Sequence, residues 1–330
     1  MKIRKLTPLF ATALLLVGCG SNSGTTKLKK PSFAKYAGQV TAEEFSKAYS
    51  EKMEGLMDLF ETEGEGDAKT VKGLKNGLTI SVKDYENSAL SGKTSAGTKV
   101  QASREGYSEM TMKVDKTNQR ANSLTKSESS MSYKNANITY DYYDSEAKLI
   151  KFSYPTVMNG STSVSYKMAS ESQSEVVNGT GRSINVTEKT YRDQVLPSGY
   201  DWSKQMAQTA MYYYQSFAQN TFTSMPTYMG EEDVKYYVDA DILTMVASKT
   251  FDGTFKEDGL EYTSKATVEY ITQLDFKGLK FDVSYEKTIE ESGKQGNLKL
   301  VAKAYEHGEY VNKDVTIKAV DVSKFVDLDK

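Results

Sequence analysis

Few residues in this chain have the types and spacing that catalysis requires. The one histidine, His307, stands in Glu306-His307-Gly308-Glu309, a run typical of an exposed turn. A serine hydrolase of the Gly-x-Ser-x-Gly type needs a nucleophile elbow, and the chain has none. One histidine and one cysteine cannot supply a zinc site built from these residues. We therefore expect no enzymatic activity and no cofactor.

Two further patterns contain residue types found in ligand sites, but neither has the full spacing that such a site requires. Ser91-Gly92-Lys93-Thr94 is similar to the end of a phosphate-binding loop, but the first glycine of that motif is replaced by Asn87. Three acidic clusters lack the Asp-x-Asp-x-Asn-Gly spacing of a loop that wraps calcium. We expect these clusters to be solvated loops without a metal: Glu61–Asp67, Glu231–Asp233 and the pair Asp239 and Asp241.

The strongest chemical signal lies at the N-terminus. Lys2, Arg4 and Lys5 precede a short apolar run, Leu6–Val17, and small residues then lead to Cys19, the only cysteine. A basic segment followed by an apolar run and a small-residue site is typical of an export signal. This run of 12 residues would span about 18 Å as a helix. A transmembrane anchor is disfavoured, because the hydrocarbon core is about 30 Å thick.

Leu16-Val17-Gly18-Cys19 resembles the lipobox of bacterial lipoproteins. This resemblance implies cleavage after residue 18, a diacylglyceryl group on the Cys19 sulfur, and attachment to the extracytoplasmic face of the bacterial cell membrane. More than one acyl chain is needed for stable anchoring. Secretion without a lipid, with Cys19 incidental, is the alternative.

The composition bears on partners. The formal net charge is −2, and only five of the 42 basic residues are arginine. Nucleic-acid binding favours arginine forks on a basic face, so we expect no nucleic-acid partner. Protein partners are not indicated by any motif.

Residues 19–36 comprise the expected lipidated cysteine and a tether. The segment begins rich in glycine, serine, asparagine and threonine and becomes basic at Lys27, Lys29, Lys30 and Lys35. Such a composition predicts a flexible chain. The lysines either contact anionic lipid or belong to a plain solvated linker.

A first helix is predicted over residues 42–61. Thr41-Ala42-Glu43-Glu44 fits a capping box, in which the Thr41 hydroxyl and the Glu44 side chain each bond the other residue's backbone N–H. An apolar stripe at helical spacing then follows, formed by Phe45, Tyr49, Met53, Leu56, Met57 and Phe60.

From Leu78 the apolar period changes to two, which predicts roughly eight to ten short strands before residue 193. Strands with one apolar and one polar face are typical of antiparallel sheets covered on one side. The expected fold class is α+β, predominantly antiparallel β. The clearest alternating residues are Met110, Met112, Val114, Ile138, Tyr140 and Ile150.

A second helix is predicted after Asp201, a capping residue, with Trp202, Met206, Ala210, Tyr213, Tyr214 and Phe217 on one side. Alternating strands then resume. We therefore expect two helix-plus-sheet units, over 37–196 and 197–330, either separate or sharing one continuous sheet.

The stretch Met110–Tyr154 resembles part of the bacterial lipoprotein-carrier (LolA-like) family. A strand, an Arg-bearing strand with Arg120, and a turn at Tyr143-Asp144 carry the resemblance. It implies a curved half-barrel sheet with helices across its open side, and binding of acyl chains in a hydrophobic groove.

Together these patterns predict a membrane-anchored, non-enzymatic binder of a lipid or other acylated molecule. A structural or protein-interaction lipoprotein without a small ligand is the alternative, and an envelope hydrolase is the third reading. The candidate groove joins the helix stripe to the alternating strand residues: Phe45, Tyr49, Met53, Leu56, Met57, Phe60, Met110, Met112, Val114, Ile138, Tyr140 and Ile150.

Overall fold

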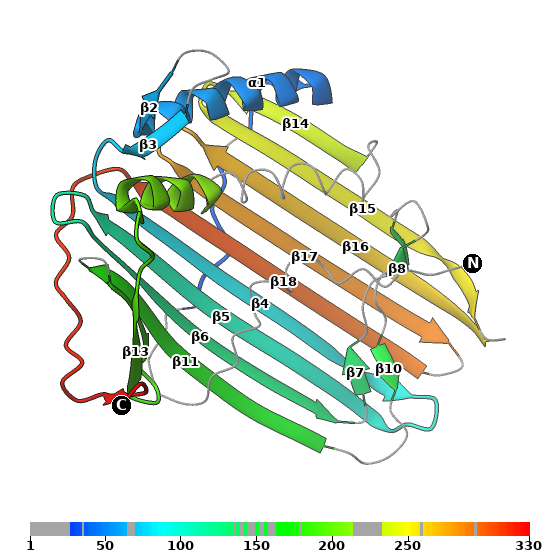
Figure 1. The fold of residues 1–330 in the computed structure, drawn as a ribbon. Coiled ribbons are helices and arrows are strands. Elements are labelled where there is room, and N and C mark those ends of the chain that lie inside the picture. The colour runs from blue at the N-terminus through cyan, green and yellow to red at the C-terminus, as the bar shows by residue number, and fades with distance from the viewer. Residues whose placement is uncertain are drawn as a thin grey trace.

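The computed structural model confirms the predicted fold class, because the chain is mainly antiparallel β with helices on one face of an open sheet (Figure 1). It describes residues 27–34, 36–64, 70–134, 136–138, 142–143, 149–151, 155–157, 163–177, 180–213, 233–257, 260–293 and 296–330.

The N-terminal half alternates short and long elements. They are β1 (Gln39–Val40), α1 (Ala42–Gly55), a 3-10 turn (Leu56–Leu59), β2 (Phe60–Glu63), β3 (Thr70–Leu74), β4 (Leu78–Thr94), β5 (Lys99–Asp115), β6 (Arg120–Lys134), β7 (Ala136–Ile138), β8 (Tyr142–Tyr143), β9 (Leu149–Lys151), β10 (Pro155–Val157), β11 (Ser163–Val177), β12 (Thr180–Asn185) and β13 (Thr190–Val195).

Helical residues 202–213 open the second half of the chain. The strands that follow are β14 (Val234–Asp239), β15 (Ile242–Glu257), β16 (Leu260–Asp275), β17 (Lys280–Gly293), β18 (Gly296–Val311) and β19 (Val326–Asp327). Several strands are much longer than the short strands expected, since β4 and β5 each have 17 residues.

The main sheet has 13 strands in the order β1-β14-β15-β16-β17-β18-β4-β5-β6-β11-β12-β13-β19. Every neighbouring pair is antiparallel except β13 and β19. The two halves of the chain meet where β18 pairs with β4, from Gly296 opposite Thr94 to Val311 opposite Thr79. Strands from both halves therefore lie in one sheet.

Both helices lie on one side of this sheet, here called the front face, which carries Ile80, Met112 and Val283 (Figure 1). The opposite side, the back face, carries the alternate residues, among them Tyr85 and Glu105. The front face near the helices is a packed core, where Ile80, Val114, Leu243 and Met245 are all 0% exposed.

Local signals explain the helix starts. The predicted capping box is present, with the Glu44 N–H donating to the Thr41 hydroxyl at 3.2 Å and the Thr41 N–H donating to the Glu44 carboxylate at 2.8 Å. The second helix begins as predicted, because the Lys204 N–H donates to the Asp201 carboxylate at 3.0 Å. The first helix is shorter than expected, since the chain tightens into a 3-10 turn after Gly55 and Phe60 begins a strand.

Three hairpins share one turn design. In each, an aspartate or asparagine at the end of a strand accepts a hydrogen bond from the backbone N–H three residues later, and the next residue has a positive φ. The side-chain bond fixes the turn locally, as Asx residues commonly do. The accepting residues are Asp115, Asn185 and Asp275, and the positive-φ residues are Gln119, Lys189 and Leu279.

Candidate functional site

The predicted helix stripe does face the core. Phe45 and Leu56 are buried, and Phe60, now the first residue of β2, is 6% exposed. Tyr49 and Met53 are half-buried and pack against the core. Met57 is half-buried as well, so the stripe divides into side chains that fill the core and side chains that keep exposed surface.

The contacts of α1 are with β14 and its surroundings. The ring of Phe45 lies 5.0 Å from that of Tyr236, and the ring of Tyr49 lies 6.3 Å from that of Phe276. Lys52 forms an ion pair with Asp241. These partners lie near one edge of the sheet, whereas the expected partner strand, β5, lies six places from β14 in the sheet order.

The alternating residues expected to face α1 are divided between sheets. Met112 and Val114 are buried front-face residues of β5, and Met110 is half-buried beside them. Ile138 lies in β7 and Ile150 in β9, which belong to two separate two-stranded sheets. Tyr140, like Cys19, lies outside the described residues.

A polar band crosses the front face below this core. Asp84 on β4 lies directly opposite Glu306 on β18. The Ser108 hydroxyl donates to Asp84 at 2.7 Å, and Arg104 lies 3.0 Å from Glu86. Burial raises the pKa of Asp84, and the charge of Glu86 adds to this effect although the Ser108 bond opposes it. Burial, with the charge of Asp84, raises the pKa of Glu306 well above its ordinary value.

This arrangement changes the interpretation of the 306–309 run. His307 is not in a turn, because the whole run lies within β18, and its Nδ1 is 2.8 Å from Asp282 on the back face. Within the described part of the chain, no group of three or more His, Cys, Asp or Glu side chains could hold a metal. Asp84 and Glu306 thus lie on the front face, whereas His307 lies on the back face with Asp282.

The back face carries a ladder of tyrosines and carboxylates that the N-terminal segment covers. Tyr85 donates to Glu105 at 2.9 Å, Tyr305 donates to Glu286 at 2.6 Å, and the two tyrosine rings are stacked with centroids 5.9 Å apart. Desolvation raises the pKa of Tyr85 to about 12, with the bond to Glu105 adding to the shift.

Residues 27–34 and 36–38 form a strap across this ladder. Lys27 binds Glu105 at 2.7 Å, and Lys30 binds Glu286 at 2.8 Å. The Ala34 N–H donates to the Gln273 side chain at 3.0 Å. These polar contacts hold a segment whose composition has no apolar pattern and predicts a flexible tether.

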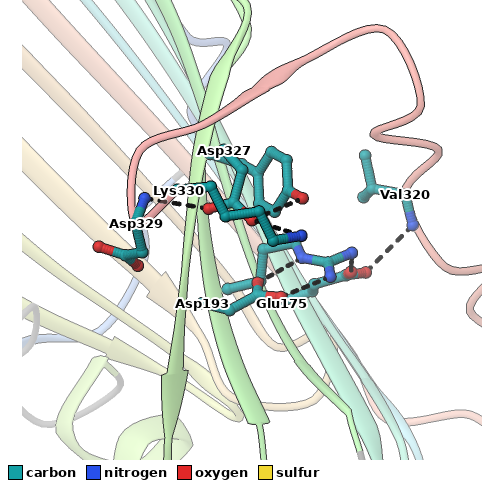
Figure 2. Close-up of polar contacts among 8 residues, drawn as sticks. Glu175, Asp193, Val320, Asp327, Asp329 and Lys330 are labelled. Atoms are coloured by element: carbon teal, nitrogen blue, oxygen red, sulfur yellow. Dashed lines mark hydrogen bonds and ion pairs between the residues drawn. The ribbon is translucent and has the colours of Figure 1, made fainter.

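The C-terminal segment is held near the β13 edge of the sheet by a second polar cluster (Figure 2). Arg182 donates to both carboxylate oxygens of Asp193, at 2.6 and 2.8 Å, and contacts Glu175 at 3.3 Å. The Val320 N–H donates to Glu175 at 3.1 Å, and Tyr191 donates to Asp327 at 3.2 Å. The bonds from Arg182 hold the pKa of Asp193 below its ordinary value.

This cluster is the C-terminal clasp, formed by Glu175, Arg182, Tyr191, Asp193, Val320 and Asp327. Glu175 is only 4% exposed, and Arg182 also lies over the Tyr191 ring, 5.1 Å from its centroid. Its hydrogen bonds join β11, β12, β13 and the C-terminal segment, so the clasp acts as a structural joint.

No family model and no curated protein matches this chain. Among solved structures, it is similar to the COG4313 outer membrane channel from Pseudomonas putida F1, at 8% identity over 76% of this chain and 100% of that chain, with a TM-score of 0.18. It is also similar to the translocator domain of the autotransporter NalP from Neisseria meningitidis, at 8% identity over 80% and 95% of the two chains, with a TM-score of 0.17. Likenesses at such TM-scores carry no conclusion about fold or function. No helix of the described residues combines the length and apolar character needed to cross a membrane.

Proposed function

We propose that this protein is a lipid-anchored extracytoplasmic lipoprotein that binds a lipid or another acylated molecule and has no enzymatic activity. The anchor is the diacylglyceryl group expected on Cys19. The LolA-like resemblance of Met110–Tyr154 is what suggests an acyl ligand.

The observation that supports ligand binding is the uneven burial of the helix stripe. Phe45 and Leu56 are buried and hold α1 on the sheet, whereas Tyr49, Met53 and Met57 keep part of their surface exposed. Unbranched, polarisable methionine side chains repack around differently shaped apolar ligands. An acyl chain lying against these side chains would remove apolar surface from water at about 25 cal/mol per Å².

A second candidate is a structural or protein-interaction lipoprotein without a small ligand. It is favoured by the complete burial of Val114 at 0% and of Met112 at 6%, because side chains already packed in the core have no surface to offer a ligand. In this case the half-buried residues of α1 would form the rim of an ordinary core.

The test pairs a denaturant melt with a titration of a fluorescent fatty acid, using Met53→Ala and, as a matched core control, Leu56→Ala. The control should lose about 2–5 kcal/mol of unfolding free energy, as large-to-small core changes do. Met53→Ala should lose about 1 kcal/mol, since a half-buried side chain has fewer contacts to lose, and should weaken fatty-acid binding.

Two results would contradict the proposal. If the wild-type protein binds no fatty acid, the lipid-binding function fails and the interaction lipoprotein remains. The anchor is tested separately by Cys19→Ser, which should accumulate as uncut precursor and incorporate no labelled lipid. Lipid labelling of that variant would refute the anchor at Cys19.

A further inference from the structure

The N-terminal strap joins the expected anchor to the middle of the back face. Lys27 binds Glu105 on β5, and Lys30 binds Glu286 on β17 and also contacts Glu269 on β16 at 3.4 Å. The strap then continues to β14, where the Val238 N–H donates to the Gly38 carbonyl at 3.1 Å. In Figure 1 this blue segment passes behind the sheet, on the side opposite the helices.

Two ion pairs mark where the strap meets the sheet. Both Glu105 carboxylate oxygens lie 2.7 Å from the Lys27 ammonium, while Tyr85 donates to one of them. The bond to Lys27 holds the pKa of Glu105 below its ordinary value, and the bond to Glu286 raises the pKa of Lys30.

The length of chain before Lys27 limits where the membrane can be. Cys19 and Lys27 are eight residues apart, and a fully extended chain of that length reaches about 28 Å. Glu105 lies on β5, five strands from the edge strand β19. At the usual strand spacing of about 4.8 Å, this nearest side edge of the sheet is about 24 Å away.

A route round that edge leaves too little chain for the front face to approach a bilayer. The sheet and a helix packed on it add about 20 Å of thickness, from a layer spacing of about 10 Å and a helix diameter of about 10 Å. The path from Glu105 round the edge and past α1 is then longer than the 28 Å reach.

We propose that the back face is the membrane-facing surface of the protein, and that the docked strap fixes this orientation on the bilayer. This inference rests on the proposed lipid anchor at Cys19. It directs α1 and the polar band of Asp84 and Glu306 away from the membrane, toward molecules that arrive from outside the cell.

The test measures two heights above the bilayer on the full chain, purified with its anchor and placed on phosphatidylcholine vesicles. Cys19 is the only cysteine of the chain, and its thiol is consumed by the thioether bond to the lipid. A thiol-reactive fluorophore therefore labels only the one cysteine that is introduced. Ser103→Cys labels an exposed back-face position on β5, and Glu51→Cys labels an exposed position on α1. Energy transfer to an acceptor lipid should place the α1 label about 20 Å farther from the bilayer.

The strap is tested with Lys27→Ala/Lys30→Ala. In this variant the free tether would run from Cys19 to Ala34, a chain that spans about 52 Å when fully extended. The difference in height between the two labels should therefore shrink. Lys27→Arg/Lys30→Arg keeps both charges, and Lys29→Ala removes an exposed charge from the same segment. Both controls should retain the wild-type difference. Neutral lipid keeps lysine–lipid attraction out of the comparison.

Equal heights, or an α1 label nearer the bilayer, would overturn the orientation in a protein shown by mass spectrometry to carry its lipid. An undiminished difference after release of both lysines would overturn the role of the strap. A protein without the lipid would instead refute the anchor, and the orientation with it, so the two failures are distinguishable.

Discussion

Truncation of Glu175 should destabilise the protein much more than truncation of another glutamate on the same strand. Glu175 is 4% exposed and joins Arg182 of β12 to the Val320 N–H of the C-terminal segment. In Glu175→Ala, Arg182 keeps its two bonds to Asp193. The Val320 N–H loses the only acceptor that the described residues give it.

The expected loss follows from these contacts. A hydrogen bond to a charged group contributes about 1.5–3 kcal/mol net. The bond to Arg182 counts for less, because Asp193 still pairs the guanidinium. We therefore expect Glu175→Ala to lose about 2–3 kcal/mol of unfolding free energy, or about 3–4 °C in melting temperature.

Glu171→Ala is the matched control. Glu171 lies on the same strand and the same face, but its side chain is 16% exposed and 3.7 Å from Lys126. Partly exposed pairs of this kind contribute about 0–1 kcal/mol. Thermal melts give the global loss, and hydrogen exchange of the Val320 amide reports the joint directly. Equal losses in the two variants, or unchanged exchange at Val320 in Glu175→Ala, would refute the reasoning.

Two further predictions follow from the polar band and from the glycines. Burial raises the pKa of Glu306 in the folded protein, so the stability linked to its protonated form is present at low pH and is lost as the pH rises through the folded pKa. Glu306→Gln should therefore raise the melting temperature at about pH 8 and leave it nearly unchanged at about pH 4; a gain of equal size at both would contradict this. Gly308→Ala would place a Cβ 1.9 Å from the Phe281 ring and should cost about 3 kcal/mol. Gly55→Ala meets nothing within 4 Å in α1 and should gain about 0.5–1 kcal/mol; denaturant melts that rank the two glycine variants in the opposite order would show the packing argument to be wrong.

Features that depend on neighbouring residues were predictable from the sequence. The capping box of Thr41 and Glu44 and the cap at Asp201 need only a few consecutive residues, and both are present. The alternation of Met110, Met112 and Val114 correctly indicated a strand with one buried face. The helix stripe was predictable in the same way, because its spacing alone determines which side is apolar.

Contacts between distant segments were not predictable. The partner of Phe45 is Tyr236 on β14, and nothing in the local pattern of either segment specifies that pairing. His307 was expected in a turn because Gly308 is beside it. A glycine is accommodated in β18 because the Phe281 ring occupies the space of a side chain. Likewise the strap at Lys27 and Lys30 is held by ion pairs, and such contacts produce no periodic pattern of apolar residues in the sequence.

The seam between β4 and β18 has a consequence for the order of folding. The strands β4–β6 and the strands β14–β18 each form a meander of adjacent hairpins, but Thr79 of β4 pairs with Val311 of β18, which lies 232 residues later. Strand pairings between residues so far apart in the sequence form late in folding. Closing the long loop between them costs conformational entropy, and this cost comes before the paired strands contribute any stabilising contacts. We expect β4–β6 and β14–β18 to collapse separately and then to close along this seam. Pulse-labelled hydrogen exchange should find the β4 amides that face β18 protected last; protection before the β4–β5 hairpin would contradict a late closure.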